Sequence, residues 1–267
     1  MIAWRVHTPT LFYGLLALLS DIDLFLDVGS LDGREAFAVE AYFPRMKCIA
    51  FEPNPHNIEV IQREINRRCS GVDLETCAVG NENRAISFYT RIPFSSGNYG
   101  ASSILKFAND AGNDEFATSA IEVPMRRLDY MGAISSHTKI ALWIDVEGAG
   151  YHVLEGMSDI AQKVQIVHIE VETCPKFEGG KLAPDVVRVM GDYGFELVGS
   201  NLDKNLHRAL GDMVFLRKQA LNRIALRRIL LFAWMVEHFT MPRLVHRVLP
   251  QKLYRIGRDW FVRVVKS

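Results

Sequence analysis

The stretch 24-LFLDVGSLDG-33 decides the fold of this chain. Its apolar run ends at an aspartate, and a turn with two glycines, Gly29 and Gly33, follows before an amphipathic segment begins near Arg34. Glycine lets a backbone approach a ligand with no Cβ in the way, and the first N–H groups of a helix are free to bind it. In open α/β sheets the ligand lies at the carboxyl end of such a strand–turn–helix unit. The stretch therefore predicts a ligand-binding turn in an α/β domain.

Short apolar runs alternate with amphipathic segments through the body of the chain, which predicts crossover units on a parallel sheet. The runs at 140–148 and 164–172 are almost continuously apolar, as in buried central strands, and 194–200 and 211–218 resemble a closing pair. We expect a doubly wound, Rossmann-like, mostly parallel seven-stranded sheet in a domain that spans residues 1–218.

Both ends of the chain are expected to be helical. The segment 10–20, TLFYGLLALLS, predicts a helix packed on the body. Residues 219–267 predict a basic amphipathic tail of two helices, 219–239 and 243–265, separated by Pro242. No run reaches the roughly 18 apolar residues that are needed to span a bilayer.

Charge divides the chain at the same place. Basic and acidic residues number 31 each, but the tail 219–267 holds ten Lys/Arg against Glu237 and Asp259, so the tail is about +8 and the body about −8. Arginines among aromatic residues favour peripheral contact with anionic lipid head groups. The alternative is that the apolar face of the tail packs on the body or on a second subunit of a homo-oligomer.

The four cysteines form no C-x-x-C pair and no metal-ligand spacing, which indicates a reducing compartment. Together with the basic tail, this predicts a cytoplasmic protein that sits peripherally on the inner face of a membrane.

An acid follows the glycine turn at the spacing of a ribose-binding residue. Glu52 ends the next predicted strand, nineteen residues after Gly33, where a carboxylate accepts hydrogen bonds from both hydroxyls of a ribose. The third glycine of a dinucleotide fingerprint is absent, since Leu31 stands in the middle of the turn, and Asp27 would repel a pyrophosphate. These residues favour S-adenosylmethionine, which carries an ammonium and a sulfonium, over NAD. The alternative is that Gly29 and Gly33 only form a tight turn and that Glu52 only ends a strand in solvent, with no ligand bound.

Six motifs in sequence order resemble the FkbM-type S-adenosylmethionine-dependent methyltransferases. They are FLDVGSLDG, AFEPNPHNIEVIQREI, SSILKF, RRLDYM, WIDVEGAGYHVLEGM and IVHIEVE, and the resemblance covers about residues 22–217. It implies a class I methyltransferase fold and this cofactor. In such families the glycine turn holds the methionine part of the cofactor, the acid after the second strand holds the ribose, and the carboxylate that ends the fourth strand faces the methyl group.

These roles fall on Gly29 and Gly33, on Glu52, and on Asp145. With their neighbours in the motifs, the expected cofactor-binding residues are Asp27, Gly29, Ser30, Gly33, Glu52, Pro53 and Asp145. Two positions depart from the family pattern: Leu31 replaces a frequent Asn, and Gly150 replaces a frequent acid.

Carboxylates at the ends of the central strands are the candidate catalytic residues. Methyl transfer is an in-line displacement, in which the protein aligns two substrates and removes a proton from the acceptor. Asp145 is the expected general base, and Glu147 would orient it from the same strand face if the strand continues that far. The alternative is that Asp145 only binds cofactor or caps the next helix.

Two further residues are weaker candidates. His168 lies within an apolar strand, where a histidine is usually a hydrogen-bonded core residue, and Glu170 follows on the same face. Strand-end carboxylates suit Mg²⁺, but their spacing does not demand it, and no metal ligand is assigned.

The predicted function is methylation of a hydroxyl on a sugar, a glycan or another small molecule. The polar segment 92–119 is expected to be a lid or substrate loop. The end of the fourth predicted strand reads IDVEG and lacks the Asn/Asp-Pro-Pro-aromatic motif of amino methyltransferases, and the body is acidic, so no nucleic-acid partner is expected. Two alternatives stay open: a nicotinamide-dependent oxidoreductase, and a non-catalytic interaction protein that binds the cofactor.

Overall fold

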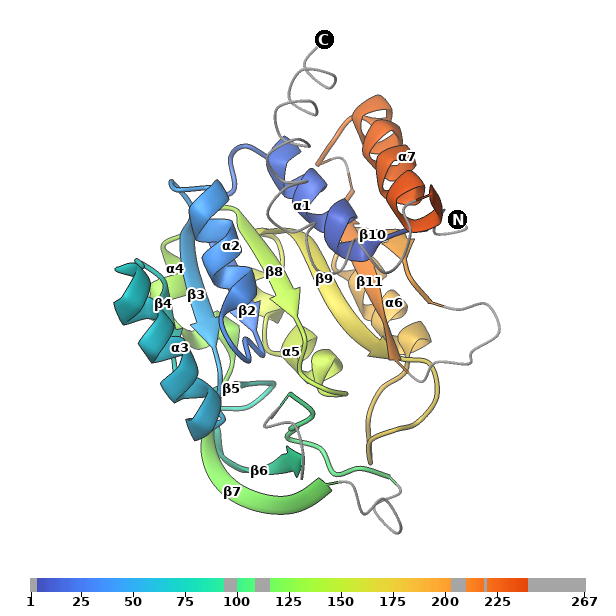
Figure 1. Cartoon of the computed structure of the whole chain (residues 1–267). Coiled ribbons are helices and arrows are strands. Elements are labelled where there is room, and N and C mark those ends of the chain that lie inside the picture. The colour runs from blue at the N-terminus through green and yellow to red at the C-terminus, as the bar shows by residue number, and fades with distance from the viewer. Residues whose placement is uncertain (1–3, 94–99, 109–115, 203–209, 219, 240–267) are drawn as a thin grey trace.

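A computed structural model describes residues 4–93, 100–108, 116–202, 210–218 and 220–239 of the chain. Its main feature is an eight-stranded sheet with the order β1-β10-β11-β9-β8-β2-β3-β4 (Figure 1). The strands are β1 (Trp4–Arg5), β2 (Leu24–Val28), β3 (Lys47–Phe51), β4 (Asp73–Glu75), β8 (Ile140–Ile144), β9 (Val164–Glu172), β10 (Phe195–Ser200) and β11 (Leu210–Arg217). The predicted seven-stranded sheet is confirmed, and the two-residue β1 extends one edge.

The centre of the sheet is parallel and its far side is antiparallel. β2 pairs in parallel with β3 and with β8, β8 pairs in parallel with β9, and β11 pairs antiparallel with both β9 and β10. All five residues of β2 and of β8 are buried, which explains why every residue of the two strands except Asp27 is apolar. From β2 the chain adds β3 and β4 on one side of β2, and it then adds β8 on the opposite side of β2. The order therefore reverses between β2 and β8, which is where such sheets bind ligands.

Helices cover both faces of the sheet, as the doubly wound pattern predicts. They are α1 (Thr8–Leu18), α2 (Arg34–Tyr42), α3 (Pro55–Arg68), α4 (Gly132–Ser135), α5 (Gly150–Glu155), α6 (Ala183–Asp192) and α7 (Arg223–Phe239), with single-turn 3-10 helices at Leu128–Tyr130 and Ser158–Ile160. One buried cluster joins α1, α2, α3 and α7 to one face, and another joins α5 and α6 to the other. Alternate residues of each strand supply the two clusters; Leu142 and Trp143 of β8 are an example.

The first helix of the predicted tail packs on the body. α7 buries Leu226, Ile229, Leu230 and Ala233 in the same cluster as α1, and an ideal Cβ on Gly14 of α1 would lie 2.2 Å from Ile229 Cδ1. This confirms the helices expected at 10–20 and 219–239 and supports the packing alternative for the latter. The helix predicted at 243–265 lies outside the described residues. Among the described helices, none has both the length and the apolar content to cross a membrane.

A second, smaller sheet corrects one prediction. It has the order β5-β7-β6 and consists of β5 (Ala78–Val79), β6 (Arg84–Pro93) and β7 (Phe116–Arg126). The segment predicted as a loop at 92–119 therefore begins and ends in strand, because β6 and β7 pair antiparallel up to Pro93 and Phe116. This long hairpin arm lies below the carboxyl ends of β3 and β8 (Figure 1).

Candidate active site

The glycine turn after β2 touches the end of β8. Gly29 has φ +83°, and an ideal Cβ there would lie 1.9 Å from the carbonyl oxygen of Asp145. No side chain fits in that space without moving the backbone. The turn that follows β2 and the turn that follows β8 therefore meet at the point where the strand order reverses.

Three of the predicted cofactor-binding residues hold this turn in shape. The buried carboxylate of Asp27 accepts hydrogen bonds from the Ser30 hydroxyl (2.6 Å) and from the Ala36 backbone N–H (3.2 Å). Burial raises the pKa of Asp27 to about 6. Gly33, the N-cap residue of α2, has φ +77°, and an ideal Cβ there would lie 2.5 Å from the ring of Phe37. Asp27, Ser30 and Gly33 do not line the pocket described below.

Glu52 links the turn to the end of β3. Its two carboxylate oxygens accept hydrogen bonds from the backbone N–H groups of Leu31 (2.9 Å) and Asn54 (2.8 Å). Burial raises the pKa of Glu52 to about 7. The Asn57 side chain is a third donor to this carboxylate. A carboxylate has about four lone-pair positions, so one remains for a hydroxyl donor. Glu52, Pro53 and Asn57 all line the pocket.

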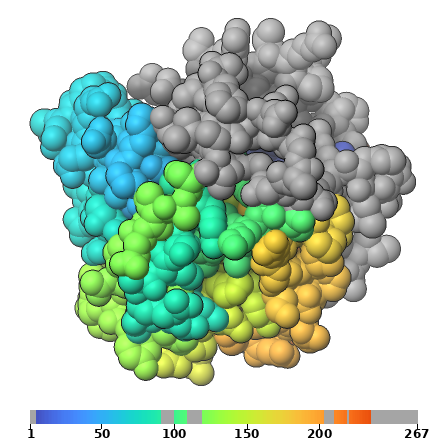
Figure 2. Space-filling view, turned by 90° about the horizontal axis from the view of Figure 1, so that it is seen from below, coloured from blue at the N-terminus to red at the C-terminus, as the bar shows by residue number. Residues whose placement is uncertain are grey.

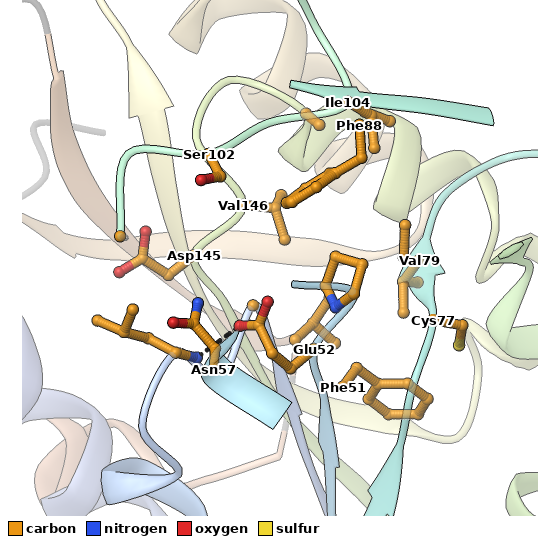
Figure 3. A pocket seen from close by; sticks show the side chains of 17 residues that line it. Phe51, Glu52, Asn57, Cys77, Val79, Phe88, Ser102, Ile104, Asp145 and Val146 are labelled. Carbon is orange, nitrogen blue, oxygen red and sulfur yellow. Dashed lines mark hydrogen bonds between the residues drawn. The ribbon is translucent and has the colours of Figure 1, made fainter. Parts of the chain in front are cut away.

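A pocket open to solvent lies between the two turns and the hairpin arm. Figure 3 shows Phe88, Ile104 and Val146 on one side, and Glu52, Asn57 and Asp145 on the other. Apolar walls with a few convergent polar groups are typical of cofactor sites. S-adenosylmethionine fits this donor set: the apolar side suits an adenine ring, Glu52 suits a ribose, and Gly29 leaves the backbone open. The predicted residues Gly29, Glu52, Pro53 and Asp145 lie together here.

Three carboxylates gather where β8 and β9 end. One oxygen from each of Asp145, Glu147 and Glu170 lies within 4.8 Å of the others. Solvent reaches the Asp145 side chain, yet its pKa is raised to about 7. Desolvation by the surrounding protein is the main cause, and the negative charges of Glu147, Asp212 and Asp27 add to it. The pKa of Glu170 is also raised, first by desolvation and then by the negative charges of Asp145, Glu147 and Asp212. Such a group could share a proton or hold a divalent cation.

Asp145 and Glu147 lie together, but not because they share one face of a strand, as the sequence predicts. β8 ends at Ile144, so the two residues do not alternate along a strand; Glu147 lies in a left-handed turn with φ +46°, followed by Gly148 with φ +82°. The turn brings their carboxylates together instead. Gly148 is needed because an ideal Cβ there would lie 2.3 Å from the ring of Phe177.

Two residues near this turn were missed in the sequence. The ammonium of Lys176 lies 3.3 Å from a carboxylate oxygen of Glu147, and the hydroxyl of Ser103 donates to the Glu147 carbonyl oxygen at 2.6 Å. Ser103 belongs to the SSILKF motif, which was the available signal. Lys176 lies four residues after a strand rich in carboxylates, and no local pattern distinguishes it.

His168 belongs to the core, as expected, but without the expected hydrogen bonds. It is 3% exposed, neither ring nitrogen has a hydrogen-bond partner, and the ring stacks on Trp143 with centroids 3.6 Å apart. Burial lowers its pKa to about 4, so the ring is neutral at physiological pH. His168 is not placed to accept a proton in the pocket.

The reversed strand order, the glycine turn and the pocket define a Rossmann-like α/β protein that binds a nucleoside cofactor. Residues 27–197, more than half of the chain, match the family model described as the methyltransferase FkbM domain, and the chain belongs to this family. The family is S-adenosylmethionine-dependent, so the protein is a methyltransferase with that cofactor, and the predicted resemblance is confirmed. The nicotinamide alternative is therefore discarded.

Solved structures of other methyltransferases show low similarity. The magnesium protoporphyrin IX methyltransferase of Synechocystis PCC 6803 with bound SAH aligns with a TM-score of 0.44 and 8% identity, over 79% of this chain and 81% of that one. An rRNA methylase from Streptococcus thermophilus aligns with a TM-score of 0.44 and 13% identity, over 82% and 99%. No curated protein matches the chain.

Proposed function

We propose that this methyltransferase transfers the methyl group to a hydroxyl of a sugar, a glycan or another small molecule. The observation that carries the proposal is the position of Asp145. It directly follows the central strand β8, lines the cofactor pocket, is open to solvent and has its pKa raised to about 7. A general base is most effective when its pKa is near the working pH.

The residues divide the work of the reaction between them. S-adenosylmethionine supplies a methyl group that is already activated by its sulfonium sulfur. Glu52 and the turn at Gly29 would hold the cofactor, and the hairpin arm would exclude water from one side. Asp145 would accept the proton of the acceptor hydroxyl, while Lys176 fixes the carboxylate of Glu147 beside it.

The cluster of carboxylates also bears on the class of acceptor. Asp145, Glu147 and Glu170 offer several hydrogen-bond acceptors and little positive charge, which suits an acceptor rich in hydroxyl groups. The same cluster would repel a phosphate backbone, in line with the expectation of no nucleic-acid partner.

The test uses S-adenosylmethionine labelled in its methyl group, incubated with the purified protein and fractionated extracts of its own cells. We expect label in a fraction of carbohydrate or small hydroxyl compounds, in a linkage that survives mild base, as a methyl ether does. Release of labelled methanol by mild base would show a carboxylate acceptor. Label on nitrogen or in nucleic acid would also contradict the proposal.

We also propose peripheral contact with an anionic membrane through the basic tail. α7 presents Ile224, Arg227 and Leu231 to solvent, and six of the ten basic residues of the tail lie between 243 and 263. Each Lys or Arg near an anionic surface contributes on the order of 1 kcal/mol. Changing four basic residues within 243–266 to Gln in the full chain should reduce co-sedimentation with anionic vesicles at low salt. Unchanged co-sedimentation, or none by the wild type, would contradict this proposal.

A further inference from the structure

Residues 100–108, which we call the strap, touch both halves of the site. Gly100, Ser102 and Ile104 of the strap line the cofactor pocket. Ser103, between them, is 1% exposed, and its hydroxyl donates to the carbonyl oxygen of Glu147 at 2.6 Å. One short segment therefore contacts the cofactor pocket and the turn after β8 together.

Backbone hydrogen bonds anchor the strap at two places. Ser103 and Tyr89 of β6 exchange N–H···O bonds of 2.7 and 3.1 Å. Further along, the Ala108 N–H donates to the Lys176 carbonyl (2.9 Å), and the rings of Phe107 and Phe177 lie 4.4 Å apart. Figure 2 shows the strap in green beside the gold segment that follows β9. The strap therefore bridges the hairpin arm and the loop that carries Lys176.

The turn after β8 depends on such outside contacts. Glu147 adopts a left-handed conformation, which is unfavourable for a residue with a Cβ, and it lies beyond the last residue of the strand. Ser103 holds its carbonyl oxygen, and Lys176 holds its carboxylate. Without Ser103 the backbone of the turn would keep fewer of the bonds that favour this conformation.

We propose that Ser103 is a positioning residue for methyl transfer: it fixes the turn 145–148 from the segment that lies against the cofactor. Occupation of the cofactor pocket and placement of Asp145 and Glu147 are then coupled through the strap. The inference rests on the proposed function in one respect: it takes Asp145 and Glu147 to be the carboxylates that lie next to the methyl acceptor.

The test compares three full-length variants. Ser103→Ala removes the hydroxyl, Ser103→Thr keeps it, and Thr90→Val is the matched control, since Thr90 is also a buried hydroxyl of the hairpin arm, bonded to the Ser119 carbonyl oxygen. Calorimetry with S-adenosylhomocysteine measures the cofactor site, and amide hydrogen exchange of residues 145–150 in that complex measures the turn. Neither measurement requires a known acceptor.

We expect Ser103→Ala to bind S-adenosylhomocysteine within about threefold of the wild type, because Ser103 is not among the residues that line the pocket. Exchange at 145–150 should accelerate about tenfold, the effect of one lost hydrogen bond, with Ser103→Thr close to the wild type and Thr90→Val unchanged there. Once an acceptor is identified, Ser103→Ala should lower kcat about tenfold with little change in the cofactor KM.

Equal exchange at 145–150 in Ser103→Ala and Thr90→Val would overturn the inference and leave Ser103 a structural residue. Accelerated exchange with unchanged kcat would also overturn it. If the acceptor proves not to be a hydroxyl, the exchange result still decides the role of Ser103, so failure of the proposed function is distinguished from failure of this inference.

Discussion

The turn after β2 and the turn after β8 look alike but are stabilised in different ways. Both follow neighbouring parallel strands, both contain left-handed residues, and they touch at Gly29 and Asp145. The β2 turn is held by Asp27 and Glu52, whose partners lie within the same two strand–helix units. The β8 turn is held by Ser103 and Lys176, 44 and 29 residues away from Glu147. The β2 turn is thus built locally, and the β8 turn is assembled from distant segments.

The largest expected effect separates the chemistry of the two turns. Asp145→Asn should cut turnover by about 10²–10⁴-fold, the usual contribution of a general base, and change S-adenosylhomocysteine affinity less than threefold. In the wild type, Asp145 must be ionised to accept a proton; because its pKa is raised to about 7, kcat should fall with decreasing pH below that value. A pH–rate profile and calorimetry measure both. A parallel loss of affinity and turnover would place Asp145 on the cofactor side.

A substitution where the turns touch should damage the cofactor side first. Gly29→Ala places a Cβ against the Asp145 carbonyl oxygen in a left-handed conformation, and the combined strain should lower the free energy of unfolding by more than about 3 kcal/mol. The backbone shift that relieves the strain should also weaken S-adenosylhomocysteine binding. Gly132→Ala is the control, because no atom lies within 4 Å of an added Cβ there. Calorimetry and thermal unfolding report the two variants. If Gly29→Ala binds like the control, the close contact of the two turns does not matter for cofactor binding.

A milder change tests whether the β2 turn is independent of the β8 turn. Glu52→Gln should weaken S-adenosylhomocysteine binding about tenfold, since charge-assisted bonds to a ribose contribute roughly 1.5–3 kcal/mol. It should leave amide exchange at 145–148 unchanged, because the Glu52 carboxylate accepts hydrogen bonds from the β2 turn and the start of α3. Glu64→Gln on the surface of α3 is the control. Undiminished binding by Glu52→Gln would remove the ribose assignment.

The smallest expected effect is a pH-dependent stability on the acceptor side. The pKa of Glu170 is raised in the folded state, so the native protein binds more protons than the unfolded chain above about pH 4, and stability falls as pH rises. The side chain of the Glu170→Gln variant cannot ionise. At pH 8 the variant should therefore have a Tm a few degrees above that of the wild type, about 2–4 °C for each kcal/mol of stability. At pH 4.5 the two proteins should have the same Tm. Thermal unfolding at both values checks this. The same shift at both pH values would show that ionisation of Glu170 is not involved.

The same contrast explains what could be predicted from the sequence. The strands, the glycine turn and Glu52 follow from local patterns, because alternation, turn residues and spacing are all set within about 30 residues. The hairpin arm was partly missed, since the pairing of β6 with β7 spans a polar segment that resembles a loop. Ser103, Lys176 and the left-handed Glu147 depend on contacts between distant segments, and only folding brings those segments together.

The pairing of the strap with the loop after β9 also has a consequence for engineering. Lys106 and Ala108 share backbone hydrogen bonds with Glu178 and Lys176, so the two segments form one exchangeable unit. A chimera that takes only one of them from a related enzyme would break these bonds, and the β8 turn would lose one of its two supports. Grafting residues 100–108 and 172–180 together would keep these bonds while the cofactor turn stays unchanged.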